Sequence, residues 1–108
     1  LVYGLPRDIV INSNEIADAI SPYLIEVATS VQNVFNVTPP ELVADIMEKG
    51  IIVSGGGAHL RFIDDFFKRM TGVETYIAEE PLFCVAKGAG LILNHLDVYK
   101  RTFLNKRF

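Results

Sequence analysis

Residues 55–57 are three consecutive glycines, which follow an apolar run at residues 51–53 and precede Ala58. Without Cβ atoms, this backbone can adopt positive φ values and come into van der Waals contact with a flat ligand. Ligands in open α/β sheets bind at the carboxyl ends of strands, which is where a turn after residues 51–53 would lie. A helix following the turn would direct unpaired N–H groups at an anion. The pattern therefore suits a nucleotide site.

The glycine turn does not have the form of the common phosphate-binding motifs. It is neither G-x-G-x-x-G nor the P-loop pattern, which needs a Lys and a Ser or Thr after its last glycine. His59 stands beyond the glycines instead. From the local sequence alone, a tight structural turn explains the glycines as well as a nucleotide site does.

The other polar residues do not form a recognisable catalytic or metal site. His59 and His95 have no Cys or carboxylate at ligand spacing, so we predict no metal site. Neighbouring side chains point in different directions, so the pairs at residues 64–65 and 79–80 are better explained as solvated surface than as acid/base dyads. Ser54 has no His or Asp in a nucleophile arrangement. We therefore predict no catalytic residue in this chain.

Cys84 and a cluster of phenylalanines favour structural roles. The chain has a single cysteine, which can form no internal disulfide and fits a reducing, cytosolic setting. Its apolar neighbours indicate a small core residue rather than a nucleophile. Phe62, Phe66 and Phe67 are expected in the core rather than in a base-stacking platform, because no basic stripe accompanies them.

The charge is distributed unevenly over the 108 residues. The net charge is −3, with −6 on residues 1–96 and +3 on residues 97–108. The body therefore offers no basic face for nucleic acid, and only the tail would attract an anionic partner. No apolar run approaches the roughly 18 residues that a transmembrane helix needs.

The first elements expected along the chain are a short strand at residues 9–11 and a long helix. Asn12 or Ser13 can cap this helix, with Glu15 in its first turn. Pro22 predicts a kink or a restart. An apolar stripe at helical spacing comprises Ile16, Ile20, Leu24, Val27, Val31 and Val34.

A second helix should begin after Thr38, which fits the N-cap position, with Pro39 as its first residue. Glu41 stands three residues after Thr38, as a capping box requires. Lys49 suits the negative end of this helix, and Gly50 suits a left-handed stop.

The remaining elements predict α/β layering. Residues 51–53 are typical of a strand covered on both faces. We expect a helix after the glycines that ends near Gly72, a strand at residues 73–78, and a last helix from residue 82 to about 96. Gly88 in that helix, like Gly90, indicates close approach to a neighbouring backbone. The order of elements fits an α/β fold.

The tail at residues 97–108 alternates two basic pairs with apolar residues. On a helix, Tyr99, Phe103, Leu104 and Phe108 would form a loose stripe edged by positive charge, which could lie on an anionic bilayer. A terminus that frays, or that folds back on the acidic body, is the interpretation we favour.

Six segments along the chain stand in the same order as in a known family. They are Gly4-Leu5-Pro6-Arg7 and residues 38–42, 45–51, 54–58, 78–82 and 84–86. Over residues 1 to about 96 the chain thus resembles the MreB family of bacterial actin-like proteins. The joint pattern is specific to that family, whereas the glycine turn alone is shared with actins, sugar kinases and heat-shock chaperone ATPases. Ser54, His59 and Ala89 depart from the residues usual in the family.

The resemblance implies an actin-like (ribonuclease H-like) ATPase fold of the α/β class. Residues 1–96 would form the C-terminal half of the large subdomain of its second lobe, incomplete without upstream segments. Residues 97–108 match no shared motif, and their own sequence makes them a basic amphipathic tail. Gly55, Gly56, Gly57 and Ala58 would contact the adenosine of ATP, and the chain around Pro81 and Leu82 would border the adenine.

The resemblance also implies which catalytic groups the chain lacks and which partners it has. The family's phosphate-binding hairpins, its Mg-coordinating acid and its water-positioning residues lie upstream of these motifs, so we expect no ATPase activity from this chain alone. The implied partners are other copies in a filament, the cell-wall synthesis machinery and the cytoplasmic face of the inner membrane, with no nucleic acid, in a cytoskeleton that determines cell shape. A lobe of a sugar kinase and a non-catalytic interaction module are the alternatives.

Overall fold

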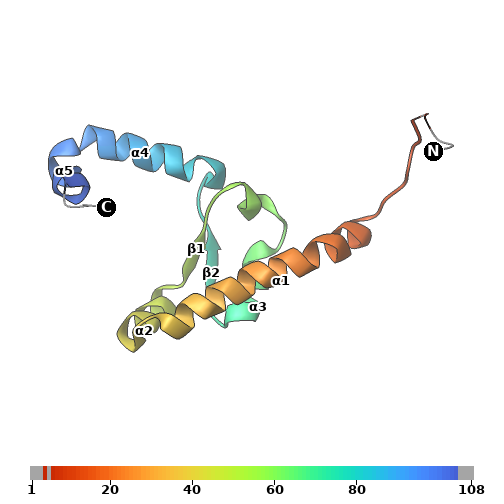
Figure 1. The fold of residues 1–108 in the computed structure, drawn as a ribbon, viewed down its shortest axis with the longest axis horizontal. Helices are drawn as coiled ribbons and strands as arrows, with labels where there is room; N and C mark the ends of the chain where they lie inside the picture. The colour runs from red at the N-terminus through yellow and green to blue at the C-terminus, as the bar shows by residue number, and fades with distance from the viewer. Residues whose placement is uncertain (1–3, 5, 105–108) are drawn as a thin grey trace. The chain divides into compact units, whose positions relative to one another are not determined.

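The computed structural model describes the backbone of residue 4 and residues 6–104, and the side chains of these residues up to residue 100. The chain consists of two compact units, Leu1–Thr38 and Pro39–Phe108. Figure 1 shows the elements in chain order. The first unit contains one helix, α1, and the second contains the strands and the other helices of the described chain.

Helix α1 (Ser13–Val37) is capped by Asn12, one of the two predicted N-caps, and Glu15 completes a capping box that was not predicted. Asn12 Oδ1 accepts the Glu15 N–H at 2.9 Å, and Glu15 Oε2 accepts the Asn12 N–H at 2.9 Å. The helix continues through Pro22 without the predicted restart. Proline removes only one backbone donor, and the other hydrogen bonds of a 25-residue helix sustain it.

The strand predicted at residues 9–11 is wrong. Residues 6–12 adopt neither helix nor strand, and the side chain of Val10 is 96% exposed. A strand needs a hydrogen-bonded neighbour, and among the described residues the only paired strands are β1 and β2. The apolar pattern of residues 9–11 could not reveal whether such a neighbour is available.

Helix α2 (Pro40–Lys49) begins one residue later than predicted, and Thr38 does not cap it. Pro39 occupies the N-cap position without a side-chain hydrogen bond. The Thr38 hydroxyl instead donates to the Val34 carbonyl at 2.6 Å, at the end of α1. The predicted end of α2 is confirmed, because Gly50 has φ 88° and its N–H donates to the Ile46 carbonyl at 2.8 Å.

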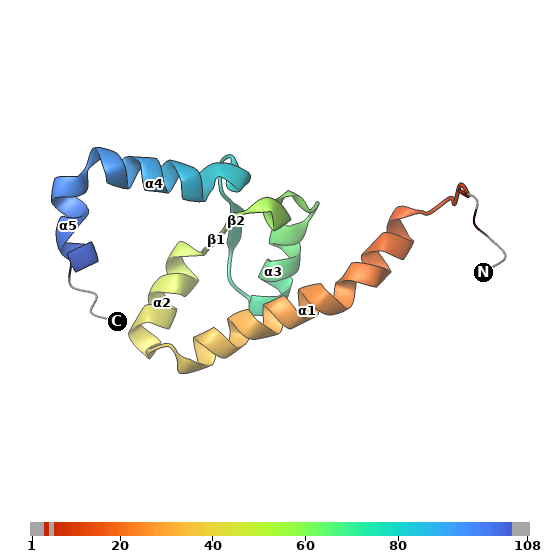
Figure 2. The same ribbon diagram turned by 45° about the horizontal axis from the view of Figure 1, so that its top comes forward.

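The sheet consists of β1 (Ile51–Val53) and β2 (Thr75–Ile77), which lie side by side (Figure 2). The two strands pair in parallel, with Ile52 opposite Tyr76. The predicted order of strand, helix and strand is confirmed, with helix α3 (Ile63–Thr71) as the crossover. The predicted coverage of β1 on both faces is wrong for this chain, because Ile52 is 72% exposed.

The core of the second unit lies between α3 and the sheet. Phe67 is buried as predicted, Phe66 is half-buried against it at a centroid distance of 5.5 Å, and Phe62 is 69% exposed, contrary to prediction. The ammonium of Lys68 lies 2.7 Å from Glu74, and this hydrogen-bonded pair raises the pKa of Lys68 above its ordinary value. The buried residues of this unit are Ala58, Ile63, Phe67, Val73, Thr75 and Pro81.

The last predicted helix is confirmed as α4 (Cys84–Asn94), preceded by the 3₁₀ turn η2 (Pro81–Phe83), and a further helix, α5 (Leu96–Leu104), follows it in the tail. His95 breaks the helix with φ −127° and ψ 39°. The predicted close approach at Gly88 and Gly90 is wrong for the described chain, because a Cβ built on either glycine meets no atom within 4 Å. Residues 97–104 are helical, and residues 105–108 lie outside the described part. No described helix is long and apolar enough to cross a membrane.

Candidate nucleotide-binding turn

The glycine turn follows β1 and has a backbone that requires glycine at its first position. Gly55 has φ 89° and ψ 177°, a conformation that residues with a Cβ rarely adopt. The four-residue 3₁₀ helix η1 (Gly56–His59) comes next. The helix predicted to follow the glycines directly is displaced, since the chain turns at Phe62, with φ 62°, before α3 begins. The turn therefore offers backbone surface rather than the end of a long helix.

The glycine turn is held against η2 by a hydrogen bond. The Gly55 N–H donates to the Pro81 carbonyl at 2.7 Å. Beside it, a Cβ built on Gly56 would lie 3.5 Å from Leu82 Cδ1, an ordinary van der Waals distance. The structure thus brings together two segments that the sequence analysis associated with one ligand, the glycine turn and the chain at Pro81 and Leu82.

The accessibility of the turn differs along its length. Gly56 and Gly57 are exposed, and a Cβ built on Gly57 meets no described atom within 4 Å. Ala58 is buried with 5% of its surface exposed, so its methyl group packs in the core and only its backbone is available to a ligand. Leu82 is exposed next to the glycines. Gly56, Gly57 and Leu82 thus leave backbone atoms and one apolar side chain open to van der Waals contact.

The Cys84 side chain lies near the turn and contacts backbone carbonyls. The Cys84 thiol is half-buried and lies 3.7 Å from the carbonyl oxygens of Glu79 and Glu80. Within the described part of the chain, no group of three His, Cys, Asp or Glu side chains is placed to hold a metal ion.

Sequence reasoning missed the unusual backbone of Glu80. This residue has φ 46° and ψ 60°, and its carboxylate forms an ion pair with Lys87 of α4. Residues 79 and 80 are both exposed, as predicted, so only the backbone conformation and the ion pair were missed. The spacing of Glu80 and Lys87 in the sequence could have indicated the ion pair. Nothing in the sequence indicated the left-handed backbone of Glu80.

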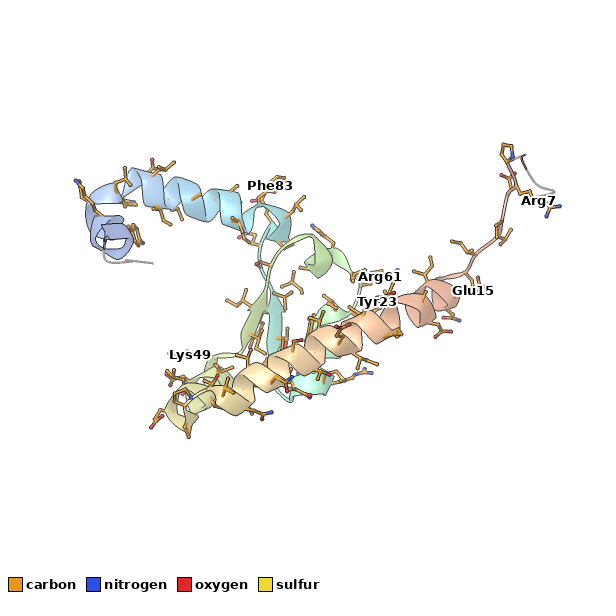
Figure 3. All side chains as sticks on the ribbon, viewed as in Figure 1. Arg7, Glu15, Tyr23, Lys49, Arg61 and Phe83 are labelled. Carbon is orange, nitrogen blue, oxygen red and sulfur yellow. The ribbon has the colours of Figure 1, made fainter. Side chains whose placement is uncertain are left out.

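A separate open pocket of about 490 Å³ lies on α3 and includes no residue of the glycine turn. Arg61, labelled in Figure 3, lies in the loop before α3, and Phe83 is the last residue of η2. The guanidinium of Arg61 lies 5.7 Å from the centroid of the Phe62 ring. The pocket is lined by Phe62, Asp65, Phe66 and Arg69.

Comparison with known proteins identifies the family. The family described as MreB/Mbl protein matches residues 1–101. The chain is 40% identical over 99 residues to the cell shape-determining protein MreB of Escherichia coli K12, covering 92% of this chain and 28% of that protein. It is 39% identical over 97 residues to the cell shape-determining protein Mbl of Bacillus subtilis 168, covering 90% and 29%. The chain thus spans less than a third of the length of these curated relatives.

Two solved structures have the same fold. MreB5 of Spiroplasma citri bound to ADP superposes with a TM-score of 0.84 at 35% identity, covering 98% of this chain and 31% of that one. The same protein bound to AMPPNP gives a TM-score of 0.83 at 34% identity, covering 92% and 30%. The predicted fold class is therefore confirmed as part of an actin-like ATPase domain with mixed helices and sheet. From the family match over residues 1–101 and these relatives, the chain belongs to the MreB/Mbl family of cell shape-determining proteins.

Proposed function

We propose that this chain is the C-terminal segment of a longer bacterial actin-like protein that binds ATP, polymerises and determines cell shape. In this proposal the segment supplies the adenosine-binding turn, Gly55 to Ala58. The single observation that supports it most is the open glycine turn at the end of β1, whose Gly55 is hydrogen-bonded to Pro81. The related MreB5 structures were solved with ADP and with AMPPNP.

The chemistry proposed for the turn is binding and orientation of the nucleoside. The positive φ of Gly55 and the absence of Cβ atoms at Gly56 and Gly57 let a flat ligand approach the backbone closely. Leu82 adds an apolar side chain beside the turn. The adenine base of the nucleoside is flat, largely apolar on its faces and uncharged, and it therefore fits this surface better than a phosphate group would.

Hydrolysis of ATP falls outside the proposed role of this chain. Phosphoryl transfer depends on positioning and charge stabilisation around the phosphates and their Mg²⁺. In the proposal, the groups that hold the phosphates and the Mg²⁺ belong to segments outside this chain. The chain alone then binds ATP weakly through one face of the nucleoside and does not cleave it.

The partners proposed for the longer protein are other copies of itself in a filament, the cell-wall synthesis machinery and the cytoplasmic face of the inner membrane. Exposed apolar residues of the sheet support the proposal that this segment belongs to a longer protein, because Ile52 and its register partner Tyr76 are 72% and 52% exposed. Apolar sheet faces of this kind are covered in a complete domain.

Hydrogen exchange of the full-length gene product tests the proposed ATP site. Below the concentration at which filaments form, Mg·ATP should slow amide exchange in peptides that cover residues 54–58 and 80–83. Peptides from the last turns of α3 serve as the control and should not change. Equal exchange with and without ATP at residues 54–58 would favour the non-catalytic interaction module instead.

A further inference from the structure

We propose that Glu80 is a positioning residue for the nucleotide site, which holds the glycine turn in place through Pro81 and Lys87. The inference rests on the proposed function and adds a residue outside the glycine turn to it. The left-handed backbone of Glu80 directs the chain so that the Pro81 carbonyl meets the Gly55 N–H.

The backbone of Glu80 is the first observation that carries this inference. Among the described residues other than glycine, only Glu80 and Phe62 have positive φ. Such a conformation is disfavoured for residues with a Cβ and persists where the surroundings enforce it. Glu80 directly precedes Pro81, whose carbonyl accepts the Gly55 N–H at 2.7 Å. The strained residue is therefore one peptide bond from the contact that joins η2 to the glycine turn.

The side chain and carbonyl of Glu80 supply the interactions that enforce this conformation. Its carboxylate pairs with Lys87, and its carbonyl accepts the Phe83 N–H at 2.9 Å. Its carbonyl also lies 3.7 Å from the Cys84 thiol. A glycine would adopt the same φ without strain but could not form the ion pair. The ion pair with Lys87 and the hydrogen bond from the Phe83 N–H together explain why an acidic residue is suitable at a position whose backbone favours glycine.

The alternative is that Glu80 stabilises the fold in general, without any particular effect on the turn. The two cases differ in which hydrogen bonds weaken when Glu80 is changed. The bond from the Ile51 N–H to the Glu74 carbonyl, 2.8 Å long, joins the chain at the opposite end of β1 and does not involve η2. It therefore reports on the fold, whereas the Gly55 amide reports on the turn.

Amide exchange in the full-length gene product, resolved to single amides below the concentration at which filaments form, separates these cases. Glu80→Val places a β-branched residue at positive φ, and we expect the Gly55 amide to exchange about tenfold faster. Lys87→Met removes only the ion pair, which is half-exposed, and should accelerate Gly55 exchange about two- to fivefold. Glu80→Gly is the matched control, because it keeps the left-handed backbone and should resemble Lys87→Met rather than Glu80→Val.

In all three variants the Ile51 amide should exchange within about twofold of its original rate, because its bond is independent of η2. Equal acceleration of the Ile51 and Gly55 amides in Glu80→Val would overturn the inference in favour of a general structural role. An unchanged Gly55 rate would overturn it as well.

Affinity of the full-length gene product for a fluorescent ATP analogue completes the test. We expect Glu80→Val to weaken binding about tenfold and Lys87→Met about two- to fivefold, in the order of their Gly55 exchange rates. If Gly56→Asp abolishes binding while Glu80→Val leaves it unchanged, the site stands and the role of Glu80 is refuted. If Gly56→Asp also binds normally, the proposed function itself fails.

Discussion

The ring of Tyr76 lies so close to Gly50 that a Cβ built on Gly50 would be 2.7 Å from Tyr76 Cε2. The Glu74 carbonyl would be 2.8 Å from the same Cβ, and Gly50 has φ 88°. Helix α2 can therefore join β1 at this point only through glycine. The space that a Cβ would need is occupied by the Tyr76 ring of β2 and by the Glu74 carbonyl.

Substitution of Gly50 by alanine should destabilise the chain. Strain at positive φ and the contact with a backbone oxygen together should cost at least about 2 kcal/mol of unfolding free energy. Gly57→Ala is the control and should change stability by less than about 0.5 kcal/mol, because its Cβ would meet no described atom within 4 Å. Urea denaturation followed by circular dichroism measures both, and equal midpoints for the two variants would refute the argument.

The isolated chain should associate with itself through the sheet. Ile52 and Tyr76 are exposed register partners, and β1 and β2 form a sheet of two strands within the described chain. Ile52→Lys should shift the chain toward monomer in size-exclusion chromatography with light scattering. Val10→Lys changes an even more exposed residue outside the sheet and should have no such effect. A wild-type chain that is monomeric at high concentration contradicts this prediction.

No ATP turnover above buffer is expected from the isolated chain, because the phosphate-binding groups of the proposed site lie outside it. A phosphate-release assay with Mg·ATP measures this, with the full-length gene product as the positive control. Mg-dependent turnover by the chain that Gly56→Asp abolishes would contradict the proposed division of roles.

A membrane contact of the basic tail is the alternative to the frayed or folded-back terminus that we favour. Residues 97–104 lie in helix α5, with Val98 and Tyr99 exposed and Lys100 on the same helix. Each basic residue near an anionic bilayer contributes about 1 kcal/mol. We expect the chain and a variant without residues 97–108 to co-sediment equally with phosphatidylserine vesicles. Stronger, salt-sensitive binding of the chain with its tail would instead establish the membrane contact.

Local signals in the sequence were sufficient for much of the fold. The N-cap at Asn12, the helix end at Gly50 and the order of strand, helix and strand at β1, α3 and β2 were all predicted from neighbouring residues. Each depends on groups close together in the chain, which the sequence displays directly.

The errors concern features that depend on distant partners or on competition between partners. The apolar residues 9–11 suit a strand, but pairing needs a neighbour that their own sequence does not specify. The Thr38 hydroxyl could cap the start of α2 or bond to the end of α1, and it donates to the Val34 carbonyl of α1. At the candidate site the glycines were found from their pattern, whereas the backbone of Glu80 follows from contacts with η2 and α4.

The central claim is that the surface of the glycine turn receives the nucleoside of ATP. Gly56→Asp would place a charged side chain on that surface, against a polyanionic ligand. Gly56→Ala is its matched control, because the added Cβ lies at an ordinary 3.5 Å from Leu82 Cδ1.

Equilibrium binding of a fluorescent ATP analogue to the full-length gene product and to these two variants tests this claim most directly. We predict that Gly56→Asp weakens binding at least about tenfold, a loss of about 1.4 kcal/mol, while Gly56→Ala stays within about threefold of the original protein. Unaltered ATP affinity in Gly56→Asp would contradict the assignment of the turn.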